Sequence, residues 1–291
     1  MTIIRSLLFA PANRPELLRK FPRYPADAFV IDLEDGTPDA EKSAARDALP
    51  ALVGELREHA LPGRLLVRVN EPGSERSAAD VDAALGAGAD GIVIPKLNTV
   101  SDLQWVASVV ARQGRGPSAC PPILVGIIEG MAGVQNAPAI AAALPRLSAL
   151  AFGAEDFIAD IGGRRTAEGL EVLYARSRVV LAARAAGIVA IDQATVNIRD
   201  DGEFTRDATM GRNLGYGGKI CLLPRQVEIA NEVFSPSAQE IDRSRRVVAA
   251  YDAARAEGRG VIDYEGRMID TPLLKHAYGV LDLASRLGRH R

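Results

Sequence analysis

The sequence predicts an α/β fold, a (β/α)8 TIM barrel with a C-terminal helical arm and lid. Short apolar, β-rich segments alternate with longer segments of helical periodicity, which indicates a parallel sheet. The eight predicted strands span residues 6–11, 28–35, 65–70, 91–97, 123–130, 147–156, 188–194 and 218–224. Periodicity alone does not separate a closed barrel from an open, doubly wound sheet.

The polar ends of the predicted strands favour the barrel. In a parallel barrel the carboxyl ends of all strands share one rim, where barrel enzymes place their active sites. An open sheet gathers polar ends only near its switch point. Here polar ends occur on six predicted strands, and the residues are Asp32, Glu34, Asp35, Arg68, Asn70, Lys96, Glu129, Glu155, Asp156 and Asp192. This distribution is typical of a ring of strands.

The pattern changes after about residue 235, which predicts two parts: a catalytic barrel domain, 1–235, and a helical arm and lid, 236–291. In the second part, residues 235–260 are typical of a helix with a Ser-rich start. Residues 261–270 predict a short hairpin that turns at Glu265-Gly266, and a further helix opens at Thr271-Pro272. This part is too small for an independent domain, so we expect it to pack on the barrel or on a neighbouring subunit.

The composition is that of a soluble globular protein. Of 291 residues, 47% are hydrophobic and 25% charged, with 35 Lys and Arg against 37 Asp and Glu. There is no basic excess to indicate a nucleic-acid or anionic-membrane partner. No apolar segment approaches the ~20 residues that cross a bilayer, and the N-terminus is not typical of a secretory signal. Cys120 and Cys221 lack metal-ligand spacing and predict free thiols, so we expect a cytoplasmic protein.

Two acids form the predicted metal site. Glu129 ends the fifth predicted strand and Asp156 the sixth, so in a barrel they are neighbours on the rim. Two converging carboxylates repel each other unless a cation lies between them. Oxygen ligands, few histidines and no paired cysteines favour a hard cation, Mg²⁺ or Mn²⁺. The alternative is that a backbone group or an arginine satisfies each acid separately.

Arg68 lies inside an apolar strand and needs a partner. It could pair with a core acid such as Glu34, or it could hold a substrate carboxylate beside the metal. Strand alternation directs Asp32 and Glu34 to one face and Asp35 to the other. The three histidines, His59, His276 and His290, lie in helical segments or the tail and resemble neither metal ligands nor a triad base.

Nine segments together resemble the citrate lyase β-subunit-like family, which includes malyl-CoA and citramalyl-CoA lyases. In chain order, between residue 5 and about residue 277, they are RSLLFAPAN, DAFVIDLEDGTP, VRVN, IVIPK, IIEG, FGAEDFIADIG, LYARSRVVLAARAAGIVAID, GGKICLLPRQ and GRMIDTPLLKHA. The resemblance implies a homotrimeric barrel that binds Mg²⁺. It also implies cleavage of a 3-hydroxy-acid thioester of coenzyme A to a 2-oxo acid and an acyl-CoA.

The resemblance also implies roles for particular residues. Glu129 and Asp156 match the metal ligands, and Arg68, together with Glu129, matches the group that binds the 2-oxo acid. Asp270 matches the acid–base residue that the lid of an adjacent subunit delivers, and Lys20 matches a lysine that contacts coenzyme A. Glu34 and Asp35 complete the catalytic candidates.

The sequence departs from the common family pattern at three positions. Gly130 follows the metal-binding glutamate where threonine is common, Leu223 replaces a histidine after the last strand, and Glu16 replaces a basic residue. Two other functions therefore remain alternatives: a 2-oxo-acid aldolase that does not use coenzyme A, and a non-catalytic subunit that binds a 2-oxo acid and a metal.

Overall fold

The computed structural model describes residues 3–112, 121–143, 147–256, 258, 262–264 and 266–288. Contacts between residues divide the chain into two compact units, Met1–Asn231 and Glu232–Arg291. The boundary lies inside helix α10 (Pro224–Val233).

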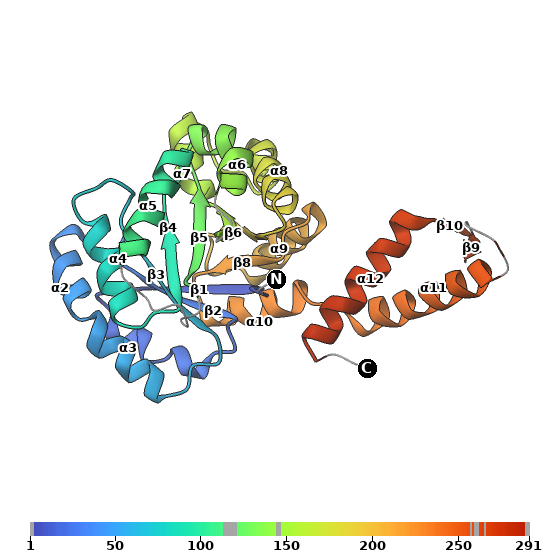
Figure 1. Ribbon diagram of the computed structural model, residues 1–291, viewed down its shortest axis with the longest axis horizontal. Coiled ribbons are helices and arrows are strands. Elements are labelled where there is room, and N and C mark those ends of the chain that lie inside the picture. The colour runs from blue at the N-terminus through green and yellow to red at the C-terminus, as the bar shows by residue number, and fades with distance from the viewer. Residues whose placement is uncertain are drawn as a thin grey trace. The chain divides into compact units, whose positions relative to one another are not determined.

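The first unit is a closed barrel of eight parallel strands, which confirms the predicted (β/α)8 fold (Figure 1). The ring closes because β8 pairs with β1, with Lys219 opposite Ser6. The strands are β1 (Ser6–Pro11), β2 (Ala28–Asp32), β3 (Arg64–Arg68), β4 (Gly91–Ile94), β5 (Ile123–Ile128), β6 (Leu147–Phe152), β7 (Val189–Asp192) and β8 (Gly218–Cys221).

Helices follow the strands and surround the barrel (Figure 1). The α-helices before α10 are α1 (Pro15–Leu18), α2 (Lys42–Asp47), α3 (Leu49–Glu58), α4 (Ser77–Gly86), α5 (Val100–Arg112), α6 (Met131–Ala143), α7 (Ala154–Ile161), α8 (Leu170–Ala185) and α9 (Asp201–Leu214). Two short 3-10 helices, η1 (Phe21–Arg23) and η2 (Asp39–Glu41), lie beside α1 and α2. In the described part of the chain, no helix has both the length and the apolar character needed to span a membrane.

Several predicted strands were too long at their carboxyl ends. The prediction that Asp156 ends the sixth strand was wrong, because β6 stops at Phe152 and Asp156 lies in the first turn of α7. Acidic side chains are favourable in a first helical turn, where the helix dipole is positive. Strand β2 likewise ends at Asp32, because its carboxylate accepts the main-chain N–H groups of Glu34 and Gly36 and turns the chain.

Small aliphatic side chains from all eight strands, with Ile4, fill the barrel interior. The buried cluster contains Ile4, Leu7, Ala28, Val30, Leu66, Val93, Val125, Ile127, Ala149, Ala151, Val189, Ile191 and Ile220. These residues alternate along each strand with residues that face the helices, as the pleat requires. The filled core leaves the interior-facing polar side chains at or beyond the carboxyl ends of the strands, as with Asp32 and Arg68, so the candidate chemistry lies at the rim.

A buried ion cluster fixes α8 and α9 against the strands. Asp192 and Lys219 alternate with the interior residues of β7 and β8, and both are fully buried. Arg176 of α8 donates from Nε to Asp192 at 2.8 Å, and Lys219 forms ion pairs with Asp192 and with Asp207 of α9. Asp192 therefore has a structural partner and does not point to the rim with the other strand-end acids.

The second unit is a pair of helices with a hairpin between them. Helices α11 (Ala238–Ala256) and α12 (Thr271–Arg286) pack around Val247, Tyr251 and Ala277. Strands β9 (Ile262–Tyr264) and β10 (Arg267–Ile269) pair antiparallel, which confirms the predicted hairpin. Glu265 and Cys120 lie outside the described residues, whereas Cys221 is a buried free thiol, as predicted.

The ion cluster makes the stability of the barrel depend on pH in acid. Burial acts to raise the pKa of Asp207, but the charges of Lys219 and Arg176 outweigh it and lower the pKa to about 2. Asp207 ionises near pH 4 in an unfolded chain. Its contribution, about 2 kcal/mol, is therefore complete above pH 4 and is lost as the pH falls through 2. We expect the free energy of unfolding, measured with denaturant between pH 5 and pH 2, to fall less steeply with pH for Asp207→Asn than for the unchanged protein. Equal pH dependence in the two proteins would contradict the cluster's role.

Candidate functional site

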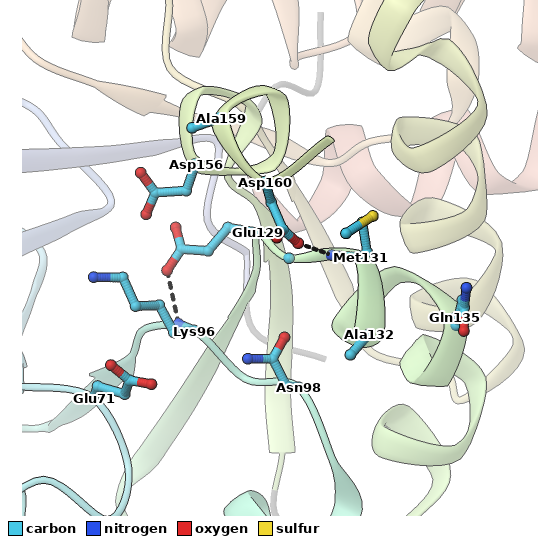
Figure 2. A pocket seen from close by; sticks show the side chains of 11 residues that line it. Glu71, Lys96, Asn98, Glu129, Met131, Ala132, Gln135, Asp156, Ala159 and Asp160 are labelled. Atoms are coloured by element: carbon cyan, nitrogen blue, oxygen red, sulfur yellow. Dashed lines mark hydrogen bonds between the residues drawn. The ribbon is translucent and has the colours of Figure 1, made fainter. Parts of the chain in front are cut away.

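A cavity of about 730 Å³ opens beyond the carboxyl ends of β4, β5 and β6. Its walls come from the loops after β3, β4 and β5 and from helices α6 and α7 (Figure 2). The lining residues are Glu71, Lys96, Asn98, Glu129, Gly130, Met131, Ala132, Gln135, Asp156, Ala159 and Asp160. This is the rim on which barrel enzymes carry their active sites.

Glu129 is a buried carboxylate with one tight main-chain partner. Glu129 is 6% exposed, and its Oε1 accepts the main-chain N–H of Lys96 at 2.7 Å. Gly153 permits the approach of α7, because a Cβ at that position would lie 2.4 Å from Oε2 of Glu129. Burial raises the pKa of Glu129 to about 8, and the negative charges of Asp156 and Glu34 add to the effect. The site therefore concentrates more negative charge than it neutralises.

Asp156 lines the same cavity as Glu129, as the sequence predicted. Figure 2 shows both carboxylates pointing into one space, Asp156 from α7 and Glu129 from the end of β5. Among the residues that the structure describes, no group of three or more His, Cys, Asp or Glu side chains could hold a metal ion. Of the four acids that line the cavity, Glu129 and Asp156 form the predicted pair, and two carboxylates suit Mg²⁺, which keeps several water or substrate oxygens.

Arg68 is bound to two acids of β2 and the loop that follows it. Its Nε and Nη2 donate to the two oxygens of Asp32 at 2.7 and 2.6 Å, and its Nη1 lies 2.9 Å from Glu34. Of the two alternatives for Arg68, the structure shows the ion pair with a core acid. Its predicted contact with a substrate carboxylate stays a prediction.

Asp32 is the important partner that the sequence did not single out. It lies directly opposite Arg68 in the pairing of β2 with β3, so the strand register itself contained the signal. Gly36 allows the turn to close over this carboxylate, because a Cβ at Gly36 would lie 2.2 Å from Oδ2 of Asp32. The turn leaves Glu34 buried and the Asp35 side chain 57% exposed, in line with their predicted opposite faces.

The departure at Gly130 changes how the loop after β5 packs. A Cβ at Gly130 would lie 2.8 Å from Oδ1 of Asn98. That same oxygen accepts the N–H of Gly133, and Asp160 accepts the N–H of Met131 at 2.6 Å. Asn98 and Asp160 therefore hold the start of α6, and glycine at 130 provides the space that Asn98 needs.

Two predicted site residues lie elsewhere in the fold. Lys20 was expected on the first helix, but α1 ends at Leu18 and Lys20 precedes η1, because Phe21 is followed by a proline that disfavours further α-helix. Lys20 does not line the cavity. Asp270 belongs to the second compact unit, where its carboxylate caps α12 by accepting the N–H of Leu273 at 3.3 Å.

The fold is that of a TIM barrel with an acidic candidate site at the carboxyl end of its strands. The chain belongs to the HpcH/HpaI aldolase/citrate lyase family, whose model matches residues 5–224. This match confirms the predicted family and the predicted enzyme class, a carbon–carbon lyase of the citrate lyase β-subunit type.

Relatives and solved structures agree with the family. A citrate lyase subunit beta-like protein of Deinococcus radiodurans is 41% identical over 281 residues, 96% of each chain. The human mitochondrial citramalyl-CoA lyase is 31% identical over 295 residues, covering 97% of this chain and 86% of its own length. The structure of protein CitE from Mycobacterium tuberculosis in complex with magnesium, acetoacetate and coenzyme A superposes with a TM-score of 0.79 at 32% identity, covering 97% of this chain and 98% of that one.

The Arg68–Asp32 pair yields a stability prediction. Asp32→Asn removes a charge that Arg68 needs inside the protein, so we expect the free energy of unfolding to fall by about 3 kcal/mol. Asp35→Asn is the matched control, since its side chain is exposed, and we expect a change below about 0.5 kcal/mol. Urea denaturation measures both. Equal effects of the two substitutions would show that Asp32 does not anchor Arg68.

Proposed function

We propose that the protein is a Mg²⁺-dependent lyase that cleaves a 3-hydroxy-acid thioester of coenzyme A to a 2-oxo acid and an acyl-CoA. The substrate is of the malyl-CoA, citramalyl-CoA or citryl-CoA type. The observation that carries the proposal is the convergence of Glu129 and Asp156 on one cavity. Two similar proteins support it: a citramalyl-CoA lyase, and a solved structure that contains magnesium and coenzyme A.

The residues of the cavity fit a divalent cation. Glu129 and Asp156 would hold it, with Mn²⁺ as a possible substitute for Mg²⁺, through carboxylate oxygens that both ions prefer. Burial, together with the negative charges of Asp156 and Glu34, raises the pKa of Glu129, and a bound cation would favour its ionised form. When bound, Mg²⁺ supplies positive charge that stabilises an alkoxide oxygen.

The remaining steps need groups of this chain. Cleavage breaks the bond between the hydroxyl-bearing carbon and the α-carbon of the thioester. The hydroxyl group gives up its proton to water, its oxygen forms the carbonyl of the 2-oxo acid, and the electron pair of the broken bond passes to the thioester enolate. Asp270, as the acid–base residue, would protonate the enolate carbon, or remove that proton in the condensing direction. Arg68 and Glu34 would orient the polar end of the substrate relative to the breaking bond, with Asp35 beside them at the rim.

Assembly completes the proposed site. We propose a cytoplasmic homotrimer in which residues 236–291 act as a lid and bring Asp270 to the barrel, residues 1–235, of an adjacent subunit. Lys20 would contact coenzyme A. Leu223 and Glu16 lie in the half of the site that would hold the thioester, so they bear on whether coenzyme A or an acyl-carrier protein presents the acyl group.

The metal ligands can be tested by substitution. We expect Glu129→Gln and Asp156→Asn each to weaken Mg²⁺ binding at least about tenfold in calorimetry, because each removes one of two anionic ligands. Glu71→Gln is the matched control, since Glu71 lines the same cavity away from the pair, and it should bind Mg²⁺ normally.

Product analysis separates the proposed reaction from its alternatives. With Mg²⁺, the unchanged protein should release glyoxylate, pyruvate or oxaloacetate together with an acyl-CoA from one of the three thioesters. Release of free coenzyme A thiol without a 2-oxo acid would indicate thioester hydrolysis instead. Mg²⁺-dependent 2-oxo-acid binding without turnover of any thioester would favour a non-catalytic subunit, and turnover of a 2-oxo acid without coenzyme A would favour an aldolase.

The proposed role of Asp270 gives a prediction about subunits. Asp270→Asn should lower kcat at least about a hundredfold, the usual range for loss of a general acid–base group, while Mg²⁺ affinity stays unchanged. Co-expression of the Asp270→Asn and Glu129→Gln chains should restore part of the activity, since one intact lid can then meet one intact barrel. Two inactive chains that stay inactive together in purified mixed oligomers would contradict delivery across subunits.

A further inference from the structure

Lys96 differs in charge from every other ionisable residue on the cavity wall. Within the described part of the chain, the lining contains four acids, Glu71, Glu129, Asp156 and Asp160, and Lys96 is the only base. An anionic substrate that enters such a cavity meets net repulsion unless a cation compensates it. Lys96 is therefore the lining residue whose charge matches a carboxylate substrate.

The backbone of Lys96 has an unusual conformation. Its φ is +48°, in the left-handed region that side chains other than glycine rarely adopt. In this conformation its N–H points at Oε1 of Glu129, 2.7 Å away, and the next N–H, of Leu97, donates to the carbonyl of Ile127 at 3.1 Å. The loop after β4 is thus bound to the end of β5, and the conformation places the Glu129 carboxylate.

The side chain of Lys96 makes a second, separate connection. Its ammonium donates to Oε1 of Glu34 at 2.7 Å and lies 3.7 Å from Oδ2 of Asp35, yet the side chain remains 33% exposed. Burial acts to lower the pKa of Lys96, but the hydrogen bond and charge of Glu34 outweigh it, and the pKa stays above its ordinary value. The group is a permanent cation, and an ammonium has three N–H donors to share.

Arg68, a second cation near the rim, is less accessible to a ligand. Its side chain is 15% exposed, three of its nitrogens contact Asp32 and Glu34, and it does not line the cavity. Glu34 lies between the two cations, since it accepts from Lys96 and pairs with Arg68. Figure 2 shows the Lys96 side chain extending along the wall beside Glu129, toward the space that Asp156 also faces.

We propose that Lys96 is a substrate-binding and positioning residue of this site, with two roles carried by two groups. Its main-chain N–H fixes the Glu129 carboxylate, and its ammonium binds the carboxylate of a 2-oxo acid in the cavity. The inference rests on the proposed function, because it names the group that meets the anionic product of the reaction.

The ammonium is tested with Mg²⁺ and oxaloacetate as probes. Lys96→Met keeps the length of the side chain and removes its charge. We expect oxaloacetate to bind about tenfold more weakly at saturating Mg²⁺, whereas Mg²⁺ itself binds equally or more tightly, because a nearby positive charge has gone. Lys96→Arg should keep most of the oxaloacetate affinity. Arg64 lies at the amino end of β3, away from the rim, so Arg64→Met should change neither the oxaloacetate affinity nor the Mg²⁺ affinity. Unchanged oxaloacetate affinity in Lys96→Met would overturn this role.

The backbone role is tested by two substitutions that both remove the ammonium. Glycine adopts a positive φ freely, whereas a β-branched side chain resists it. Lys96→Gly should therefore keep the Mg²⁺ affinity of Lys96→Met, and Lys96→Val should bind Mg²⁺ at least about threefold more weakly and show a lower Tm. Equal Mg²⁺ affinity and equal Tm in the two variants would refute the backbone role.

The outcomes separate this inference from the proposed function. A protein that binds Mg²⁺ and oxaloacetate but cleaves no thioester would contradict the lyase, while the Lys96 variants would still decide the binding role. A protein that cleaves a thioester but is insensitive to Lys96→Met would support the lyase and refute the role of the ammonium. A protein that binds neither probe would refute both.

Discussion

The excess of negative charge at the rim is the constraint on which the rest of the site depends. Asp32, Glu34, Glu129 and Asp156 crowd the ends of neighbouring elements, and carboxylates that are removed from water repel one another strongly. Arg68 and Lys96 compensate Asp32 and Glu34 through short contacts. Among the residues described, no comparable contact with a basic side chain holds Glu129, whose carboxylate accepts a main-chain N–H, and burial raises its pKa.

The barrel could be predicted from the sequence because its signals are local and repeated. Each strand is a short apolar segment, and the spread of polar ends over six of the eight predicted strands indicated closure. The strand boundaries could not be predicted in the same way. Whether β2 stops at Asp32 depends on a side chain that bonds to the next turn, and whether Asp156 extends β6 or starts α7 depends on where the chain leaves the sheet, which is after Phe152.

The part of the site that could be predicted is the part formed by residues that follow adjacent strands of the barrel. Glu129 and Asp156 follow adjacent strands, so the order alone brought them to one cavity. The partner of Arg68 was less accessible to prediction, since Asp32, Glu34 and Asp35 lie within four residues and only the strand register selects Asp32. No feature of the sequence around Lys96 predicts its left-handed backbone conformation. A lysine adopts it only because contacts with Glu129 and Ile127 from the next strand impose it.

Two clusters of buried charge in the same barrel show how a functional site differs from a structural one. Arg176, Lys219, Asp192 and Asp207 include as many bases as acids, and the pKa of Asp207 is lowered, so every charge is satisfied by the protein itself. At the rim the acids exceed the bases, and the pKa of Glu129 is raised instead. A protein gains nothing in stability from an uncompensated buried carboxylate, because its desolvation is not repaid. On the proposed function, a divalent cation would supply the charge that completes this carboxylate, and Lys96 would hold the anionic substrate beside it.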